Sequence, residues 1–173
     1  MKKITVLFIA LMGLFVSVNA QEKGDMYVGG NLGFSVSSAG SNGYMNSSTR
    51  FSIAPEFGYF IVDNLKIGAE LSYSVGGAHT MTISPNVSYY LRIVDNLYYT
   101  PQFSIGGGFT SHSHNTNGVF SLSMSFLSLE FQPKENWGIS MDLVNLSYNL
   151  ENSYNHVGFN FLSSPSVGVR YYF

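Results

Sequence analysis

The C-terminal segment of the chain, residues 156–173, alternates between apolar side chains and small or polar ones, and it ends on an aromatic residue. One set of alternate positions holds Val157, Phe159, Phe161, Ser163, Pro165, Val167, Val169, Tyr171 and Phe173. Because successive side chains of a β-strand point to opposite faces, a period of two predicts a strand with one apolar face. A chain built from such strands needs an apolar environment on one side of its sheet.

Similar alternating segments recur along the chain between clusters of turn-forming residues. They are expected at residues 25–37, 49–61, 65–75, 80–93, 97–109, 119–131, 137–149 and 156–173. Alternation in segments of about ten residues is typical of strands that separate lipid from a polar lumen. The sequence therefore predicts an all-β fold, an eight-stranded antiparallel up-and-down transmembrane β-barrel.

Residues 1–20 have the parts of a secretory signal peptide, namely Lys2 and Lys3, an apolar stretch over 4–18, and small residues before Gln21. A retained membrane anchor is disfavoured, because the apolar stretch is shorter than the roughly 20 residues of a spanning helix. We therefore expect a signal peptide over 1–20 and an outer-membrane barrel over 21–173.

The composition restricts the function further. Charged residues make up 10% of the chain and aromatic residues 16%, whereas a soluble domain has about 25% charged residues. Removing residues 1–20 takes away two of the eight basic residues and none of the ten acidic ones, which leaves a formal charge of −4. We therefore expect no nucleic-acid partner, and the absence of cysteine excludes disulfides and thiol chemistry.

A short repeat indicates where the hairpins turn. The residues Ile61-Val62-Asp63-Asn64-Leu65 recur as Ile93-Val94-Asp95-Asn96-Leu97, and both Asp-Asn pairs predict tight turns. A third short connection is expected at 132–136, whereas the opposite connections, at 38–48 and 110–118, are expected to be longer loops. Short turns on the periplasmic side and long loops outside are the polarity of outer-membrane barrels.

Aromatic residues near the short turns predict a girdle at the level of the lipid headgroups. Its expected members are Tyr59, Tyr89, Tyr99, Trp137 and Tyr171.

Two irregularities interrupt the alternation. The apolar parity switches between Phe126 and Leu127, and again between Leu143 and Val144, which predicts a β-bulge or register break at each place. Proline lacks the donor that a sheet ladder requires, so each strand proline predicts a bulge or a missing bond. These prolines are Pro55, Pro85, Pro101 and Pro165.

With these features the chain resembles the small eight-stranded outer-membrane barrels of the OmpX and OmpA transmembrane-domain type. The resemblance implies a monomer in the outer membrane of a Gram-negative cell envelope, in contact with lipid. It also implies that periplasmic chaperones and the barrel-assembly machinery act during biogenesis. The C-terminal pattern is similar to the assembly signal of that family, whose positions are occupied here by Val167, Val169, Tyr171 and Phe173.

The side chains expected to face the lumen include a nearly balanced set of charges. They are Arg50, Glu56, Lys66, Glu70, Arg92, Asp142 and Arg170. The interior of an eight-stranded barrel is just wide enough for side chains to fill it. We therefore expect paired charges in a closed lumen and a structural or surface-interaction role, with a porin-like small-solute or ion channel gated by these charges as the alternative.

A third, weaker alternative is an enzyme that modifies lipid A, which would need a histidine and a serine hydroxyl. His112 with Ser111 or Ser113 is the local combination of this kind, but the order of residues does not fit the comparable deacylases. His112 and His114 could begin a metal site, but the segment offers no third ligand. We expect no catalytic activity, no cofactor and no metal.

Deletion of Phe173 is expected to impair membrane assembly, because Phe173 occupies the last position of the family's C-terminal signal. The measurement is the amount of folded barrel in outer-membrane preparations, seen on unboiled gels. Normal assembly of the shortened chain would count against the signal.

Overall fold

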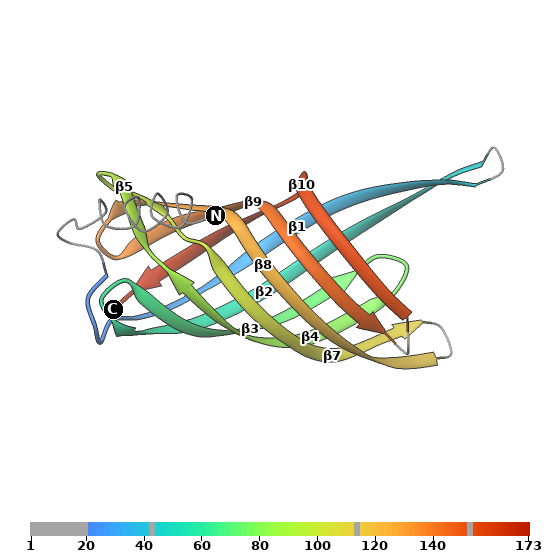
Figure 1. The fold of residues 1–173 in the computed structure, drawn as a ribbon, viewed down its shortest axis with the longest axis horizontal. Coiled ribbons are helices and arrows are strands. Elements are labelled where there is room, and N and C mark those ends of the chain that lie inside the picture. The colour runs from blue at the N-terminus through green and yellow to red at the C-terminus, as the bar shows by residue number, and fades with distance from the viewer. Residues whose placement is uncertain (1–20, 42–43, 113–114, 152–153) are drawn as a thin grey trace, which may run out of the picture.

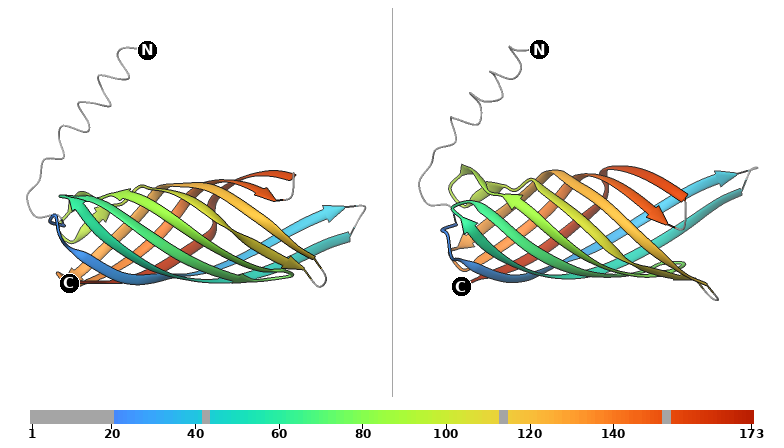
Figure 2. Two further views of the ribbon diagram at one scale, coloured as in Figure 1. Left: turned by 90° about the horizontal axis from the view of Figure 1, so that it is seen from below. Right: turned by 60° about the horizontal axis from the view of Figure 1, so that its bottom comes forward.

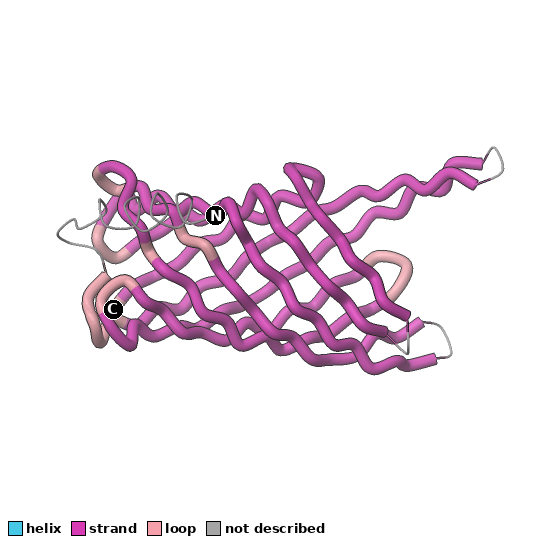
Figure 3. The backbone as a smooth tube through the Cα atoms, viewed as in Figure 1, coloured by secondary structure: helices cyan, strands magenta, loops and turns pink. Residues whose placement is uncertain are grey.

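The structure is a computed structural model that describes residues 21–41, 44–112, 115–151 and 154–173, so the expected signal peptide lies outside the described residues. No helix within these ranges is long and apolar enough to span a membrane. Figure 3 shows that strands make up nearly all of the described chain. They are β1 (Met26–Ser41), β2 (Tyr44–Val62), β3 (Leu65–Val75), β4 (His79–Tyr89), β5 (Leu91–Val94), β6 (Leu97–Tyr99), β7 (Gln102–His112), β8 (Asn115–Lys134), β9 (Trp137–Glu151) and β10 (Tyr154–Tyr172).

The strands form an antiparallel ring of eight arms, as the sequence predicts (Figures 1 and 2). β4 and β5 are two parts of one arm that is interrupted at Tyr90, and β6 and β7 are two parts of the next arm, interrupted at Thr100 and Pro101. The first strand pairs with the last in the register Tyr27↔Tyr172, which closes the ring. Closure satisfies the backbone groups that an open sheet would expose to lipid.

Alternation determines which side chains face the lumen. In β3, Lys66 is fully buried whereas its neighbour Ile67 is 44% exposed. The same contrast continues along the strand, where Leu71, Tyr73 and Val75 are all exposed on the outer face. An outer surface of this kind is stable only in contact with lipid, because water would leave its apolar side chains unburied.

The two predicted Asp-Asn turns are confirmed. Asn64 and Asn96 have φ values of 67° and 65°, a left-handed conformation that asparagine tolerates better than most residues. A register shift lies just before each turn, between Phe60 and Val62 and between Arg92 and Val94. The turns of this end, which we call the short-turn end, also include 135–136 between β8 and β9.

The prediction of longer loops at 38–48 and 110–118 is wrong. β1 runs to Ser41 and β2 starts at Tyr44, while β7 runs to His112 and β8 starts at Asn115. Backbone ladders such as Ser41↔Tyr44 do not depend on side-chain polarity, so residues with loop-like composition extend the hairpins instead. The β1–β2 hairpin reaches far beyond the other strands at this end, which we call the distal end (Figure 1).

The predicted irregularities are present. The β8–β9 register shifts on both sides of Leu127, and Leu143 is left out between the pairs formed by Val144 and Asp142. The strand prolines also coincide with interruptions, since Pro85 has no pairing on the β7 side and Pro165 lies in the break of the β9–β10 register. Pro55 similarly lies where the β2–β3 pairing is interrupted, whereas Pro101 lies between two strands rather than inside one.

Replacing Gly58 by alanine is expected to destabilise the barrel by about 1–3 kcal/mol, because the added methyl group would collide with the ring of Tyr27. The measurement is urea unfolding of the refolded barrel in lipid vesicles, followed by the fluorescence of the single tryptophan, Trp137. The matched control is Gly107→Ala, since nothing lies within 4 Å of its added methyl group. Equal effects of the two substitutions would contradict this packing argument.

Candidate functional site

A layer of aromatic side chains fills the lumen at the short-turn end. Its members are Tyr27, Phe60, Tyr90, Tyr98 and Tyr172, each at most 6% exposed. The Phe60 and Tyr90 rings meet edge to face with centroids 5.1 Å apart, and the Tyr27 and Tyr172 centroids are 5.6 Å apart. These rings come from five of the eight arms, and together they form a floor across the lumen.

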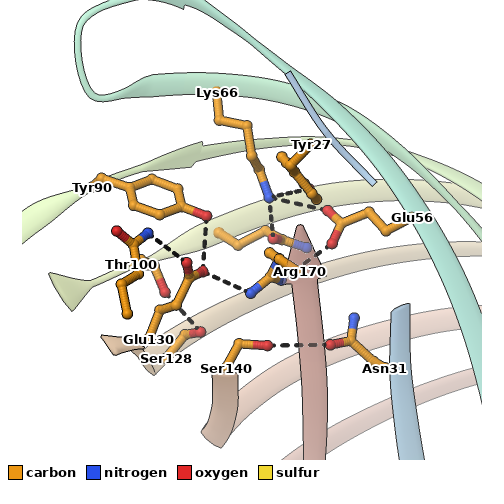
Figure 4. Close-up of polar contacts among 12 residues, drawn as sticks. Tyr27, Asn31, Glu56, Lys66, Tyr90, Thr100, Ser128, Glu130, Ser140 and Arg170 are labelled. Atoms are coloured by element: carbon orange, nitrogen blue, oxygen red, sulfur yellow. Dashed lines mark hydrogen bonds and ion pairs between the residues drawn. The ribbon is translucent and has the colours of Figure 1, made fainter. Parts of the chain in front are cut away.

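A row of four alternating charges lies beside Tyr27 and Tyr90 of this floor (Figure 4). Lys66 Nζ is 3.0 Å from Glu56 Oε1, and Arg170 Nη2 is 3.1 Å from Glu56 Oε2. The other terminal nitrogen of Arg170 is 2.9 Å from Glu130 Oε2. None of the four side chains is more than 6% exposed. We call Lys66, Glu56, Arg170 and Glu130 the charge row.

Neutral donors complete the coordination of both carboxylates. Glu130 accepts hydrogen bonds from the hydroxyls of Tyr90 and Tyr172 and from Gln132 Nε2, in addition to Arg170. Glu56 also accepts from Asn86 Nδ2, at 3.1 Å. A buried ionised carboxylate is tolerated only when it is paired and hydrogen-bonded, and both carboxylates meet this condition.

The floor and the charge row are joined by two kinds of contact. Lys66 Nζ donates to the Tyr27 hydroxyl at 2.7 Å and lies 4.8 Å from the centre of the same ring. The guanidinium carbon of Arg170 lies 5.6 Å from that ring centre. Tyr27 thus contacts both cations of the row, and we call the floor and the row together the plug.

The N-terminal segment 21–25 crosses the short-turn end below the plug. Its backbone is anchored by hydrogen bonds from Gly24 N to Phe60 O and from Asn64 N to Gln21 O. The buried side chain of Gln21 donates to Gln132 Oε1 at 2.9 Å, and Gln132 in turn donates to Glu130. A hydrogen-bonded chain therefore links the first described residue to the charge row.

The structure brings together three of the seven predicted lumen charges, Glu56, Lys66 and Arg170. The other four lie outside the charge row, so the expectation of a single network is wrong for them. Arg92 forms an ion pair with Asp95 near the short-turn rim, where Asp95 is 90% exposed. Arg50 is exposed near the distal end.

Glu70 and Asp142 face the lumen on the distal side of the row. Glu70 accepts a hydrogen bond from Asn31 Nδ2, and Asp142 accepts one from Ser166 Oγ. The expectation that Glu70 belongs to the ion-pair network is therefore corrected as well.

Sequence reasoning missed Glu130, although it is fully buried at one end of the row. Its signal was present in the parity switch after Phe126, because Ser128, Glu130 and Gln132 then alternate with apolar residues. Extending the inward set through the predicted bulge would have found it.

The predicted girdle residues lie at strand ends beside the short turns. Trp137 and Tyr171 meet edge to face with ring centroids 5.1 Å apart. The predicted assembly-signal residues Val167, Val169, Tyr171 and Phe173 all lie exposed on the outer face. The backbone of Phe173 exchanges hydrogen bonds with Met26 at 2.9 and 3.0 Å, so the last residue also helps to close the ring.

Of the histidine and serine pattern considered for metal binding and lipid chemistry, Ser111 and His112 end β7, whereas Ser113 and His114 lie outside the described residues. Among the residues that are described, no three His, Cys, Asp or Glu side chains come together as a metal site would require.

No protein-family model matches the sequence, and no curated protein matches it either. Solved structures do match in fold. The N-terminal β-barrel domain of Pseudomonas aeruginosa OprF is 12% identical, with a TM-score of 0.56, over 88% of this chain and 100% of that one. Neisserial surface protein A is 15% identical, with a TM-score of 0.53, over 86% of this chain and 99% of that one.

The fold is that of a small outer-membrane β-barrel. The exposed apolar outer face agrees with this fold, because barrels of this kind carry an apolar band that contacts lipid. Both the fold and the apolar outer face agree with the outer-membrane location that the sequence predicts.

Substitution of Glu56 by glutamine is expected to destabilise the barrel by about 3–5 kcal/mol, because it leaves Lys66 and Arg170 buried with too little negative charge. The measurement is again urea unfolding in vesicles. The control, Arg92→Gln, removes a pair with an exposed partner and is expected to cost no more than about 1 kcal/mol. A loss as large as that of the Glu56 variant would show that Arg92 belongs to the plug after all.

Proposed function

We propose that the protein is a closed outer-membrane scaffold that presents its distal hairpin beyond the membrane. The plug supports this proposal most directly, since an aromatic floor and a neutral charge row occupy the lumen at the short-turn end. Every charge of the row has an opposite partner, so the row needs no mobile ion for neutrality. A lumen filled in this way is suited to rigidity rather than to permeation.

The distal hairpin supports a role at the surface. β1 pairs with β10 only as far as Gly33↔Ser166, and β2 pairs with β3 only as far as Phe51↔Val75. Beyond these positions β1 and β2 continue as a ladder with each other, up to Ser41↔Tyr44. In this proposal the hairpin makes the external contacts and the barrel anchors it in lipid.

The same proposal includes the partners expected from the sequence. The closed ring leaves no need for a second copy at the β1–β10 junction, which favours a monomer. The short-turn end faces the periplasm, and the outer-face residues near Phe173 engage the assembly machinery before they meet lipid.

A second candidate is a small ion channel, which one observation favours. Arg170 contacts two carboxylates at similar distances, 3.1 Å to Glu56 and 2.9 Å to Glu130. A cation shared between two acceptors can exchange one for the other, and such an exchange would open a path beside the row. In this candidate the plug is a gate.

Planar-bilayer conductance of the refolded barrel distinguishes the two candidates, once an unboiled gel has shown that the protein is folded. The closed scaffold is expected to insert without discrete current steps, both as the wild type and as the Arg92→Gln control. Discrete steps whose size changes in Glu56→Gln or Glu130→Gln, but not in Arg92→Gln, would contradict the scaffold and establish the gate.

A further inference from the structure

A polar cavity of about 210 Å³ lies in the lumen on the distal side of the charge row. Seven strands line it. β10 leads from Arg170 in the row to Ser166 at the cavity, and β2 leads from Glu56 to Ala54 and Ser52. The other lining side chains are chiefly serines, with the amides of Asn31, Gln102 and Asn145 and the carboxylates of Glu70 and Asp142. The cavity adjoins the plug, because Lys66 Nζ donates to Gln102 Oε1 in its lining at 3.5 Å.

The charge of this cavity is not balanced by the protein. Its lining holds two carboxylates and no basic side chain. Glu70 and Asp142 are each held by a neutral donor, at 3.1 Å from Asn31 and 3.0 Å from Ser166. The cations just below are already engaged, since the row contains two positive and two negative groups. Both residues are partly buried, and partly buried carboxylates without a counter-charge are costly, so the cavity attracts cations from solution.

Arg50 does not supply the missing charge in this structure. It lies on β2, two residues beyond Ser52 toward the distal end, where its side chain is exposed. It is not among the residues that line the cavity.

The donor atoms of the cavity indicate which cation fits. The cavity is large enough to hold an ion together with several waters, and a calcium ion takes 6–8 oxygen ligands. The lining offers hydroxyl, amide and carboxylate oxygens and none of the nitrogen or sulfur ligands that softer metals prefer.

We propose that the cavity binds one hard divalent cation, of the calcium and magnesium class, between the carboxylates of Glu70 and Asp142. One such ion neutralises both carboxylates, and the hydroxyls and amides hold the part of its water shell that it keeps. The ion enters from the distal end, because the plug closes the other side. Binding at the cavity does not depend on whether the barrel is a scaffold or a channel; only the route of entry does.

The test is equilibrium dialysis of the refolded barrel against CaCl₂ in a neutral detergent, with the bound calcium measured per folded protein. The wild type is expected to bind one calcium ion saturably, and the double variant E70Q/D142N is expected to lose at least tenfold in affinity. The matched control is E22Q/E135Q, which removes the same charge from exposed carboxylates near the short-turn end and is expected to bind as the wild type does.

Two outcomes would overturn the proposal. Absence of saturable binding to folded wild type would show that the cavity holds water only, and undiminished binding by E70Q/D142N would place the calcium elsewhere. If the double variant does not fold, Ser104→Met carries the test, because it fills the cavity while both carboxylates remain. Calcium binding by folded Ser104→Met with unchanged affinity would equally refute the cavity as the site.

Discussion

The cost of enclosing charge in a narrow lumen governs the interior of this barrel. A buried ion is stable only with an opposite charge or strong hydrogen bonds beside it, and the charge row meets this requirement by alternation. Glu56 is central, because its two oxygens contact cations from different strands, Lys66 on β3 and Arg170 on β10. The hydroxyl groups of the aromatic floor then supply the donors that Glu130 still lacks, so the apolar and charged layers depend on each other.

A change of backbone register makes this row possible. Ser125 faces the cavity, and with strict alternation Glu130, five residues later, would face lipid. The bulge around Leu127 shifts the parity of β8, so that Ser128 and Glu130 both face inward. Its counterpart in β9 leaves Asp142 facing the lumen on the other side of Leu143. The plug therefore requires these irregularities, because without the bulge in β8 Glu130 would not face the lumen.

The sequence predicted the elements that depend on local chemistry, and it failed where a tertiary arrangement decides. Alternation identified the eight arms and the inward direction of Glu56 and Lys66, and the Asp-Asn pairs identified two turns, because each of these signals lies within one segment. Membership of the charge row depends on height along the lumen, which is determined by tilt and register across several strands. Arg92 was therefore placed in the network although it lies at the rim, and Glu130 was left out although it completes the row. The prediction of long distal loops failed for another reason. A ladder of backbone hydrogen bonds forms equally well between serines and glycines, so a loop-like composition did not prevent strand pairing.

The ion pair between Arg170 and Glu56 has a consequence for the order of folding. Its partners are separated by 114 residues along the chain, and the Gln21–Gln132 hydrogen bond joins residues 111 apart. Contacts of such long range can form only after most of the loop-closure entropy has been lost, which makes them late events in a β-topology. Lys66 and Glu56, on neighbouring strands, can meet early, but Arg170 arrives only with the last strand. A sheet that lacks only β10 would hold Glu130 without its cation, so completion of the row favours the closed ring over that intermediate.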